Sequence, residues 1–461
     1  MAIRTTAPRE RRGVAAGGND RDQHRMWVLG VLLAGLLWLV GPIAARATEC
    51  NRAMANPVVH VTLPGSPFTA LPSADGCWLF VSLESSAVHP GVAVLNRADG
   101  AVTPKRLLGL PGSPSGMVLT HDGTVLIVAN GVNVVFLDVG RLTTGAGNPL
   151  LGFWAEGHEQ PTSIYVSVTA DDRYLLVSNE GVGTVSVIDL AQTRRSRFAQ
   201  VHLVGSIAVG DGPVGLAFSS DERFLFATVQ SLNAPGWSIQ CKPEGNPTAV
   251  ADHPEGALVV IDMKLAVSDA GKSVLRRVPA GCNPVRVVTS RQAGRVYVTA
   301  RGSNELLAFT ERELTDSGPD PRATQVAVGT SPVGVAVIDD GRRVVVASSD
   351  RFNSRAAAAS LYVVDSAQLA VDSTPIVGTI PSRGFPREIR ATADGHTLLV
   401  TNCSAGTLQI VDLSRAPWDF ALNIGQPSSW LARLEPTVPA SSPFAPGPAR
   451  LGYPAPTPLT P

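Results

Sequence analysis

Short apolar stretches separated by turn residues recur along most of the chain. Residues 393–413 show the pattern clearly, with a turn at Asp394-Gly395, an alternating stretch that ends at Asn402, and a second alternating stretch that ends at Asp412. Thr, Val, Leu and Ile suit a pleated surface, and the Asp-Gly pair and the small residues 404–406 suit tight turns. The segment therefore predicts two β-strands joined by a short loop.

The same pattern occurs seven times, and each copy opens with a proline. The six intervals from Pro67 to Pro386 average about 53 residues. The opening prolines are Pro67, Pro114, Pro161, Pro213, Pro284, Pro332 and Pro386. A period near this length with four short strands is typical of a propeller blade. The sequence predicts an all-β fold, a seven-bladed β-propeller of four-stranded antiparallel blades.

The order of motifs within each copy resembles the YVTN (YncE-like) β-propeller repeat family, over roughly residues 57–415. Pro213-Val214-Gly215 and Pro332-Val333-Gly334 match its opening, and LVTN (399–402) with LQIVD (408–412) matches its middle and end. The fifth copy departs, because residues 292–294 are Gln-Ala-Gly where the repeat has Asp-Gly. The resemblance implies the fold, and one fold hosts many functions.

The two ends of the repeat region are expected to complete one blade together. The repeats begin with a lone strand at 58–63 and end after a third strand at 408–413. We expect these strands to pair and so to close the seventh blade, which removes the edge that an open sheet would expose.

The N-terminus has the features of an export signal. A polar, Arg-rich stretch at 1–25 precedes a continuous apolar run at 26–40, and Ala45-Arg46-Ala47 follows. A short apolar run before an Ala-x-Ala site is typical of a secretory signal, and this run is short for a transmembrane helix. We predict a leader at 1–47, a propeller at 48–415, a Pro-rich and largely disordered tail at 416–461, and a periplasmic or secreted protein without a membrane span after cleavage. A retained N-terminal anchor is the alternative, and the true start is either Met1 or Met26.

Export would place the five cysteines in an oxidising compartment, where an odd number leaves at least one unpaired. The strand order of the family's propeller implies that Cys241 and Cys282 meet on the top face, at the junction of blades four and five. It also implies that Cys50 and Cys77 lie together near the closure, which leaves Cys403 free. The alternative is that all five thiols are buried and free.

Residues that recur at the same position of several copies are best explained by a structural role in each blade. Aspartates end the third strand of five copies, at Asp138, Asp189, Asp262, Asp365 and Asp412. A residue that recurs in this way is typical of a turn cap that accepts backbone N–H groups. The asparagines at 130, 179 and 402 have the same interpretation.

Departures from the repeat indicate a candidate binding site. Just after the opening proline the repeat favours a small residue, but the fifth copy has Arg286 and the seventh has Arg387 with Glu388. With the charged loops after the second strands, these residues predict a funnel with opposite charges on its two sides, suited to an anionic ligand held by arginine. The predicted ligand-binding residues are Arg286, Arg301, Arg387, Glu180, Asp350 and Asn402. The alternative is an ordinary solvated loop surface.

Other chemistry has little support in the sequence. His89, His158 and His253 are weak candidates for a metal site, because their spacing does not imply that they converge. No phosphate-binding, haem, zinc-protease or hydrolase motif is present, so we expect no cofactor. Equal numbers of basic and acidic residues, 38 of each, argue against nucleic-acid binding.

Two classes of function fit these observations. The first is an exported propeller that binds a small anionic ligand or a periplasmic protein through its top face. The second is a propeller enzyme of the lactonase-like or quinoprotein-like kind. Because the catalytic motifs of such enzymes do not match this chain, the sequence favours the binding module.

Overall fold

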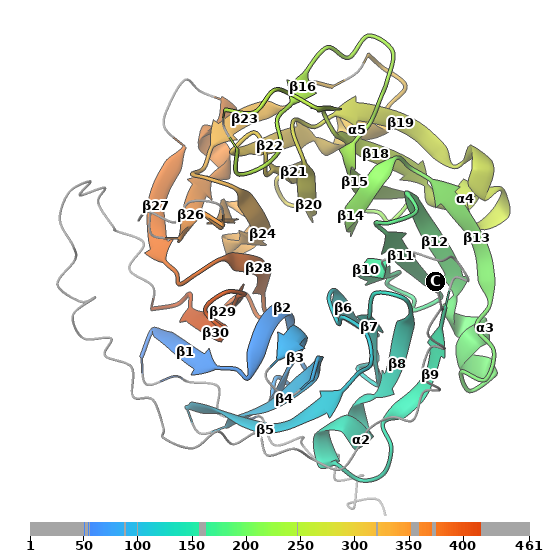
Figure 1. Ribbon diagram of the computed structural model, residues 1–461, viewed down its shortest axis with the longest axis vertical. Coiled ribbons are helices and arrows are strands. Elements are labelled where there is room, and N and C mark those ends of the chain that lie inside the picture. The colour runs from blue at the N-terminus through green and yellow to red at the C-terminus, as the bar shows by residue number, and fades with distance from the viewer. Residues whose placement is uncertain are drawn as a thin grey trace, which may run out of the picture. The chain divides into compact units, whose positions relative to one another are not determined.

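Seven four-stranded antiparallel sheets stand in a ring around a central opening, as predicted (Figure 1). The computed structural model describes Cys50, Met54 and residues 56–86, 89–98, 100–155, 163–246, 248–319, 321–351, 359–370 and 375–415. The predicted leader and tail lie outside these residues. Within the part of the chain that the structure describes, no helix is long and apolar enough to span a membrane.

Each of six blades is built from four strands that follow one another in the sequence, and in blade four a small hairpin interrupts this run. The first strand of each blade lies nearest the opening (Figure 1). Blade one contains β2 (Gly65–Pro72), β3 (Trp78–Ser86), β4 (Gly91–Ala98) and β5 (Ala101–Gly109). Blade two contains β6 (Met117–Leu119), β7 (Val125–Ala129), β8 (Val134–Asp138) and β9 (Leu150–Trp154). Blade three contains β10 (Ser163–Val168), β11 (Tyr174–Asn179), β12 (Thr184–Asp189) and β13 (Leu203–Ala208).

The next three blades follow the same order. Blade four contains β14 (Asp211–Phe218), β15 (Phe224–Ser231), β18 (Ala257–Asp262) and β19 (Val274–Pro279). Blade five contains β20 (Pro284–Ser290), β21 (Arg295–Ala300), β22 (Glu305–Thr310) and β23 (Thr324–Ala327). Blade six contains β24 (Pro332–Ile338), β25 (Arg343–Ser348), β26 (Ser360–Asp365) and β27 (Ile376–Pro381).

The seventh sheet combines strands from the two ends of the repeat region. It contains β28 (Pro386–Ala391), β29 (Thr397–Asn402) and β30 (Thr407–Asp412), and β1 (Val58–Thr62) is its outermost strand (Figure 1). β1 pairs antiparallel with β30, from Val58 opposite Val411 to Thr62 opposite Thr407.

Short helices follow the third strands, and the repeated aspartates cap them as predicted. They are α2 (Val139–Thr144), α3 (Leu190–Arg195), α4 (Met263–Ser268) and α5 (Glu311–Thr315), with 3-10 turns η1 (Ala270–Lys272), η2 (Asp339–Gly341) and η3 (Ser366–Ala370). Asp138, Asp189 and Asp262 each accept a backbone N–H three residues ahead. These carboxylates therefore satisfy helix N-termini and are structural.

Turns between the first and second strands define one face of the ring, here called the turn face. In five blades a Ser or Thr hydroxyl donates to the Asp two residues later and accepts the backbone N–H five residues later. The pairs are Ser73–Asp75, Thr120–Asp122, Thr169–Asp171, Ser219–Asp221 and Thr392–Asp394. The opposite face, which carries the loops after the second strands, is the top face.

The hydrophobic core lies between the blades. Seven apolar clusters fill the seven junctions, and each takes side chains from two adjacent sheets. Alternate residues of a strand point to opposite faces of the sheet. The second and third strands are buried on both faces, so their side chains enter the apolar clusters on both sides of the blade. Each blade is therefore stabilised by the two blades beside it.

A hydroxyl on the second strand links five of the blades to the next. The donors are Ser82, Ser178, Thr228, Thr299 and Thr401, which donate at 2.6–3.2 Å to backbone carbonyls in the following blade's first strand or, for Ser82, just before it. Each donor is the third of the four residues that end the second strand, as Thr401 is in LVTN (399–402). Blades two and six have Ala129 and Ala347 at this position, which carry no hydroxyl. The polar residue of that motif therefore holds adjacent blades together.

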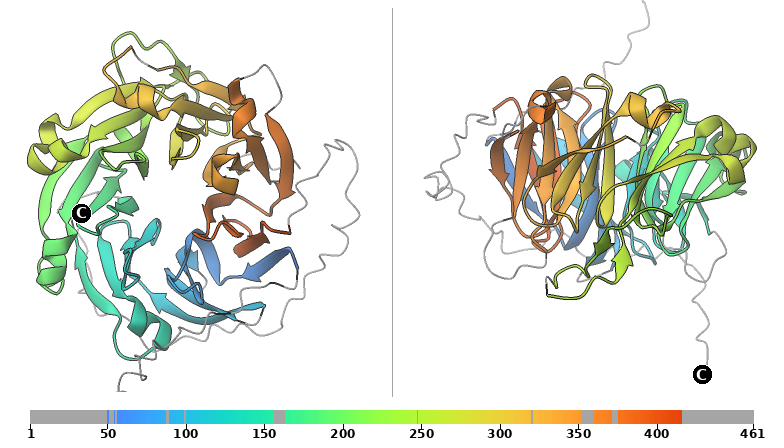
Figure 2. Two further views of the ribbon diagram at one scale, coloured as in Figure 1. Left: turned by 180° about the vertical axis from the view of Figure 1, so that it is seen from behind. Right: turned by 90° about the horizontal axis from the view of Figure 1, so that it is seen from above.

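Both predicted disulfides are present, and Cys403 is free. Cys50–Cys77 joins the segment before β1 to the first turn of blade one. Cys241–Cys282 joins an insertion at 231–256 to the segment before β20. This insertion carries the hairpin of β16 (Gln240–Cys241) and β17 (His253–Pro254), which projects from one face of the ring (Figure 2).

Removal of β1 should expose the edge of β30 and cause self-association. We expect a variant that lacks residues 56–63 to elute from a sizing column as oligomers and to lose its cooperative melting transition. A Cys50→Ser/Cys77→Ser variant is the matched control, since it loses the disulfide but keeps β1, and it should remain monodisperse. A monodisperse truncated variant that melts like the control would contradict this role of β1.

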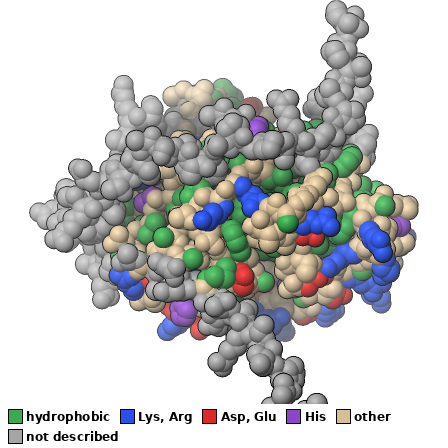
Figure 3. Space-filling model, turned by 90° about the horizontal axis from the view of Figure 1, so that it is seen from below, with side chains coloured by type: hydrophobic (Ala, Val, Ile, Leu, Met, Phe, Trp, Pro, Cys, Tyr) green, Lys and Arg blue, Asp and Glu red, His purple; other side chains and the backbone are tan. Residues whose placement is uncertain are grey.

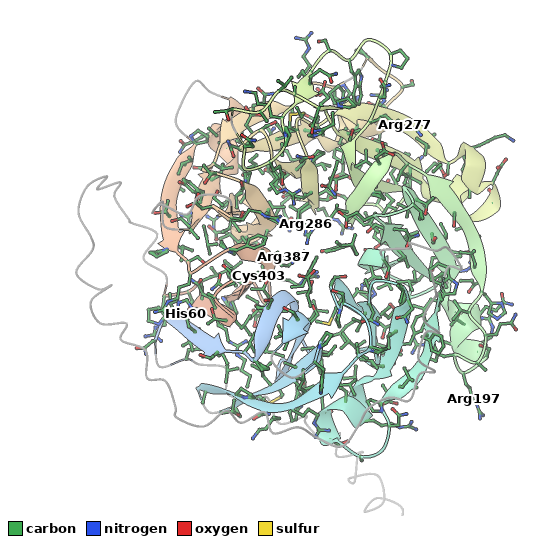
Figure 4. The ribbon with its side chains drawn as sticks, in the orientation of Figure 1. His60, Arg197, Arg277, Arg286, Arg387 and Cys403 are labelled. Atoms are coloured by element: carbon green, nitrogen blue, oxygen red, sulfur yellow. A yellow bond between two sulfur atoms is a disulfide. The ribbon has the colours of Figure 1, made fainter. Side chains whose placement is uncertain are left out.

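His60 on β1 should make stability depend on pH (Figure 4). Its Nδ1 atom is buried without a hydrogen-bond partner among the described residues. Burial, and secondarily the charge of Arg383, lowers the pKa of His60 to about 4. The unfolded chain therefore takes up the proton first, and the stability of the fold decreases as pH falls from about 6.5 to about 4.

Urea unfolding at pH 7.5 and pH 4.5 tests this expectation. His60→Gln should lose less stability between the two pH values than the unaltered protein does, because the other titrating groups are the same in both. Equal losses would show that His60 does not contribute.

Candidate functional site

The first strands place one residue of each blade at equivalent positions around the opening. Backbone pairing aligns Tyr165 with Ser178, Arg286 with Thr299, and Glu388 with Thr401. The backbone N–H groups of Thr69 and Gly215 donate to the hydroxyls of Ser82 and Thr228. Gly334 lies in the bulge of blade six, and Gly116, whose carbonyl accepts the Ala129 N–H, has the matching place in blade two. This set, here called the inner ring, is Thr69, Gly116, Tyr165, Gly215, Arg286, Gly334 and Glu388.

Glycines and large polar residues alternate around the inner ring. A Cβ atom on Gly116 would lie 2.8 Å from the Cα of Tyr165, and one on Gly215 would lie 3.0 Å from the Cα of Arg286. A Cβ on Gly334 would lie 3.1 Å from the carbonyl carbon of Glu388. Each glycine therefore lets the next blade bring its large side chain to the channel.

The three large side chains meet in a buried cluster across the channel. Arg286 Nε donates to Glu388 Oε2 at 2.7 Å, and the two side chains are only 6% and 5% exposed. Tyr165 Oη donates to the other carboxylate oxygen at 3.1 Å. The Arg286 guanidinium also lies 5.0 Å from the Tyr165 ring centre and 5.3 Å from that of Phe68. Hydrogen bonds and ring contacts thus join blades one, three, five and seven.

Electrostatics favour the charged form of this pair. Burial opposes the charge on Arg286, but the Glu388 carboxylate, Tyr165 and Glu180 together outweigh it and raise the pKa of Arg286. Burial and the same carboxylate raise the pKa of Tyr165, which keeps its phenol protonated and able to donate. The cluster is therefore an ion pair with a neutral hydrogen-bond donor.

Arg390 adds a second guanidinium beside the same carboxylate. Its Nη2 atom donates to Tyr165 Oη at 3.2 Å and lies 3.6 Å from Glu388 Oε1. Its Nε atom is buried with no hydrogen-bond partner among the described residues. The four side chains together carry one net positive charge.

Four predicted site residues lie on the top face or close to it, and three of them, Arg387, Arg301 and Glu180, have charged or amide partners there. Arg387 pairs with Glu84, and its guanidinium stacks 3.9 Å from the Phe68 ring centre. Arg301 pairs with Glu244 and also donates to Gln230, which in turn donates to Glu180 at 2.7 Å. Gln230 thus bridges Arg301 and Glu180, and the structure brings these two together.

The remaining predicted residues have other environments. Arg286 is not at the channel mouth but is buried and paired with Glu388. Asn402 is fully buried in blade seven, where its amide contacts Ser382, Thr407 and Gln409. Asp350 accepts a hydrogen bond from Thr330 at 2.8 Å. The structure does not bring Arg286 or Asn402 to the top-face group.

Two of the predicted arginines have carboxylate partners from other parts of the top face. Glu84 of blade one reaches Arg387 of blade seven, and Glu244 of the insertion reaches Arg301 of blade five. On the edge of the ring seen in Figure 3, acidic side chains likewise lie beside basic ones. Coulomb attraction between neighbouring loops accounts for this pairing.

A top-face pocket lies beside Arg387, and one predicted site residue, Asp350, lines it. It has a volume of about 370 Å³ and is lined by Ser349, Asp350, Arg351, Ala359, Gly384, Phe385 and Ser404. The Arg351 guanidinium lies 5.0 Å from the Phe385 ring centre, and that of Arg387 lies 5.7 Å from it. Burial and the charges of Arg301 and Arg387 lower the pKa of Arg351, while Glu244 and Cys403 partly oppose this. Three guanidiniums are therefore close enough to repel one another.

The two predicted histidines that the structure describes, His89 and His253, have different neighbours. His253 contacts Asp252, and His89 Nδ1 lies 3.3 Å from the Pro90 carbonyl. His158 lies outside the described residues. Among the residues that the structure describes, no three His, Cys, Asp or Glu side chains could hold one metal ion.

Comparisons with known proteins add support for the fold. No protein-family model matches the chain, and no curated protein matches it significantly. Among solved structures, the chain is similar to hydrazine synthase of Kuenenia stuttgartiensis, with a TM-score of 0.55 and 16% identity over 81% of this chain and 99% of that one. It is also similar to a chain of the mitotic checkpoint complex, with a TM-score of 0.55 and 15% identity over 81% and 98% of the two chains. At this identity the likeness shows the propeller fold alone.

Removing one partner of the buried ion pair should be costly. Glu388→Gln leaves Arg286 without a counter-charge, and we expect a loss of about 3–5 kcal/mol in the free energy of unfolding. Arg286→Met/Glu388→Leu removes both charges and should lose much less. Urea unfolding of Arg286→Met, Glu388→Leu and the double variant measures the coupling, and additive losses would contradict a buried ion pair.

Proposed function

We propose that this protein is exported and binds a small organic anion at the top-face pocket beside Phe385. The observation that carries the proposal is the convergence of Arg301, Arg351 and Arg387, which come from blades five, six and seven. Burial and the charges of Arg301 and Arg387 lower the pKa of Arg351, so these guanidiniums repel one another. An anion placed among them would relieve this repulsion, which favours its binding.

The pocket also offers contacts besides charge. Phe385 presents a ring on which the Arg351 guanidinium lies, so that arginine is held in one orientation. Asp350 is held by Thr330 and would repel an anion on its own side of the pocket. These features favour a planar carboxylate aligned with Arg351 over an unoriented ion.

Two disulfides support the proposed export. A disulfide persists in an oxidising compartment and is rare in reducing ones. Cys50–Cys77 and Cys241–Cys282 both have ordinary Cα–Cα separations, of 5.4 and 5.6 Å. With the apolar run before Ala47, they are consistent with a protein that is secreted or periplasmic.

Calorimetric titration with succinate, citrate and phosphate tests the proposed function. We expect at least one of these anions to bind, and Arg351→Gln to weaken binding by about tenfold or more because a charge-assisted contact is lost. Arg197→Gln is the matched control, since Arg197 is exposed at the outer edge of the ring (Figure 4). Equal affinities for Arg351→Gln and the control would contradict this site.

A further inference from the structure

A cavity of about 340 Å³ fills part of the central channel, on the turn-face side of the inner ring. Its walls come from β6, β10, β14, β20, β24 and β28, and it reaches Thr289 and Ala391 near the turn-face ends of their strands. Tyr165, Arg286 and Glu388 form its other end. The cavity is therefore separate from the top-face pocket, and none of its lining residues is shared with that pocket.

The charge within this cavity is not balanced. The charged lining residues are Arg286, Glu388 and Arg390, so two guanidiniums share one carboxylate. The two oxygens of Glu388 already accept hydrogen bonds from Arg286 and Tyr165. Arg390 therefore contributes a positive charge that the cavity does not neutralise, in surroundings where charge is poorly screened.

Arg390 is also the charged residue that is accessible from the cavity. Its side chain is 31% exposed, whereas those of Arg286 and Glu388 are almost fully buried. Its contact with Tyr165 Oη holds the guanidinium beside the phenol. An anion there would meet a fixed donor and would need little rearrangement of the protein.

The remaining walls are small and mostly apolar. They include Val118, Ser167, Ala217, Val288 and Val337. Such walls suit the hydrocarbon part of a ligand, and the volume lies near the lower end of the range for small-molecule pockets.

We infer that this channel cavity is a second binding site, which takes a small monocarboxylate with an apolar substituent. The carboxylate pairs with Arg390 close to Tyr165, and the substituent contacts the valine-lined wall. Glu388 remains bound to Arg286 and repels a second carboxylate, which favours monoanions over dianions. This inference stands apart from the proposed top-face function.

Butyrate and benzoate are suitable probes, and their amides are the uncharged controls. Calorimetric or NMR titration of the full chain should show that the two acids bind and that butyramide and benzamide bind at least about tenfold more weakly. Absence of binding by both acids at millimolar concentration would overturn the inference, and so would equal binding of acids and amides.

Two variants then place the site. Arg390→Met keeps the side-chain stem and removes the excess charge, while Ser167→Phe keeps the charge and fills the cavity. Both are made in an Arg351→Gln background, so that the top-face pocket does not contribute. Both should weaken butyrate binding by about tenfold or more relative to Arg351→Gln alone, and Arg197→Gln in the same background should leave it unchanged. Thermal melts of each variant check that it is folded. Unchanged binding in folded Arg390→Met or Ser167→Phe would place the probe elsewhere and contradict the inference, whatever the outcome at the top-face pocket.

Discussion

The close approach of adjacent first strands at the channel is the constraint on which the rest of the ring depends. Where seven sheets meet around one axis, backbone atoms of neighbouring blades come within contact distance, and a glycine at 116, 215 or 334 is needed to allow it. In five junctions a Ser or Thr hydroxyl uses this proximity to donate to the next blade's carbonyl. Each such bond adds about 1 kcal/mol, and the apolar clusters between the sheets add more.

The same constraint decides where large side chains can go. A side chain that enters the channel needs a small neighbour, and Tyr165, Arg286 and Glu388 each follow a blade whose inner-ring residue is glycine. Because these three reach one another, their charges are satisfied internally, and the channel is closed by an ion pair. Arg390 then lies below the pair with its charge only partly balanced. The glycines that let adjacent blades approach at the inner ring therefore also give the cavity its excess positive charge.

The sequence predicted the blades well because their determinants are local. Turn aspartates, alternating strands and the opening prolines recur at a fixed period, and the aspartate caps followed from that order. Both disulfides followed from the strand order that the family resemblance implies. The site was predicted less well because it depends on contacts between distant blades. Arg286 and Glu388 were visible as departures from the repeat, but their pairing joins residues 102 positions apart. Tyr165 was missed because its blade has two extra residues before the turn, and Arg351 because a loop arginine has no periodic signal.

The exchange rate of the Arg286 Nε proton tests the closed channel most directly. With arginine labelled by nitrogen-15, the Nε–H resonance of Arg286 should be assignable by its loss in Arg286→Lys. A proton that is held by Glu388 and shielded from water should exchange with solvent much more slowly than that of exposed Arg197. An Arg286 proton that exchanges as fast as that of Arg197 would contradict a channel closed by this ion pair.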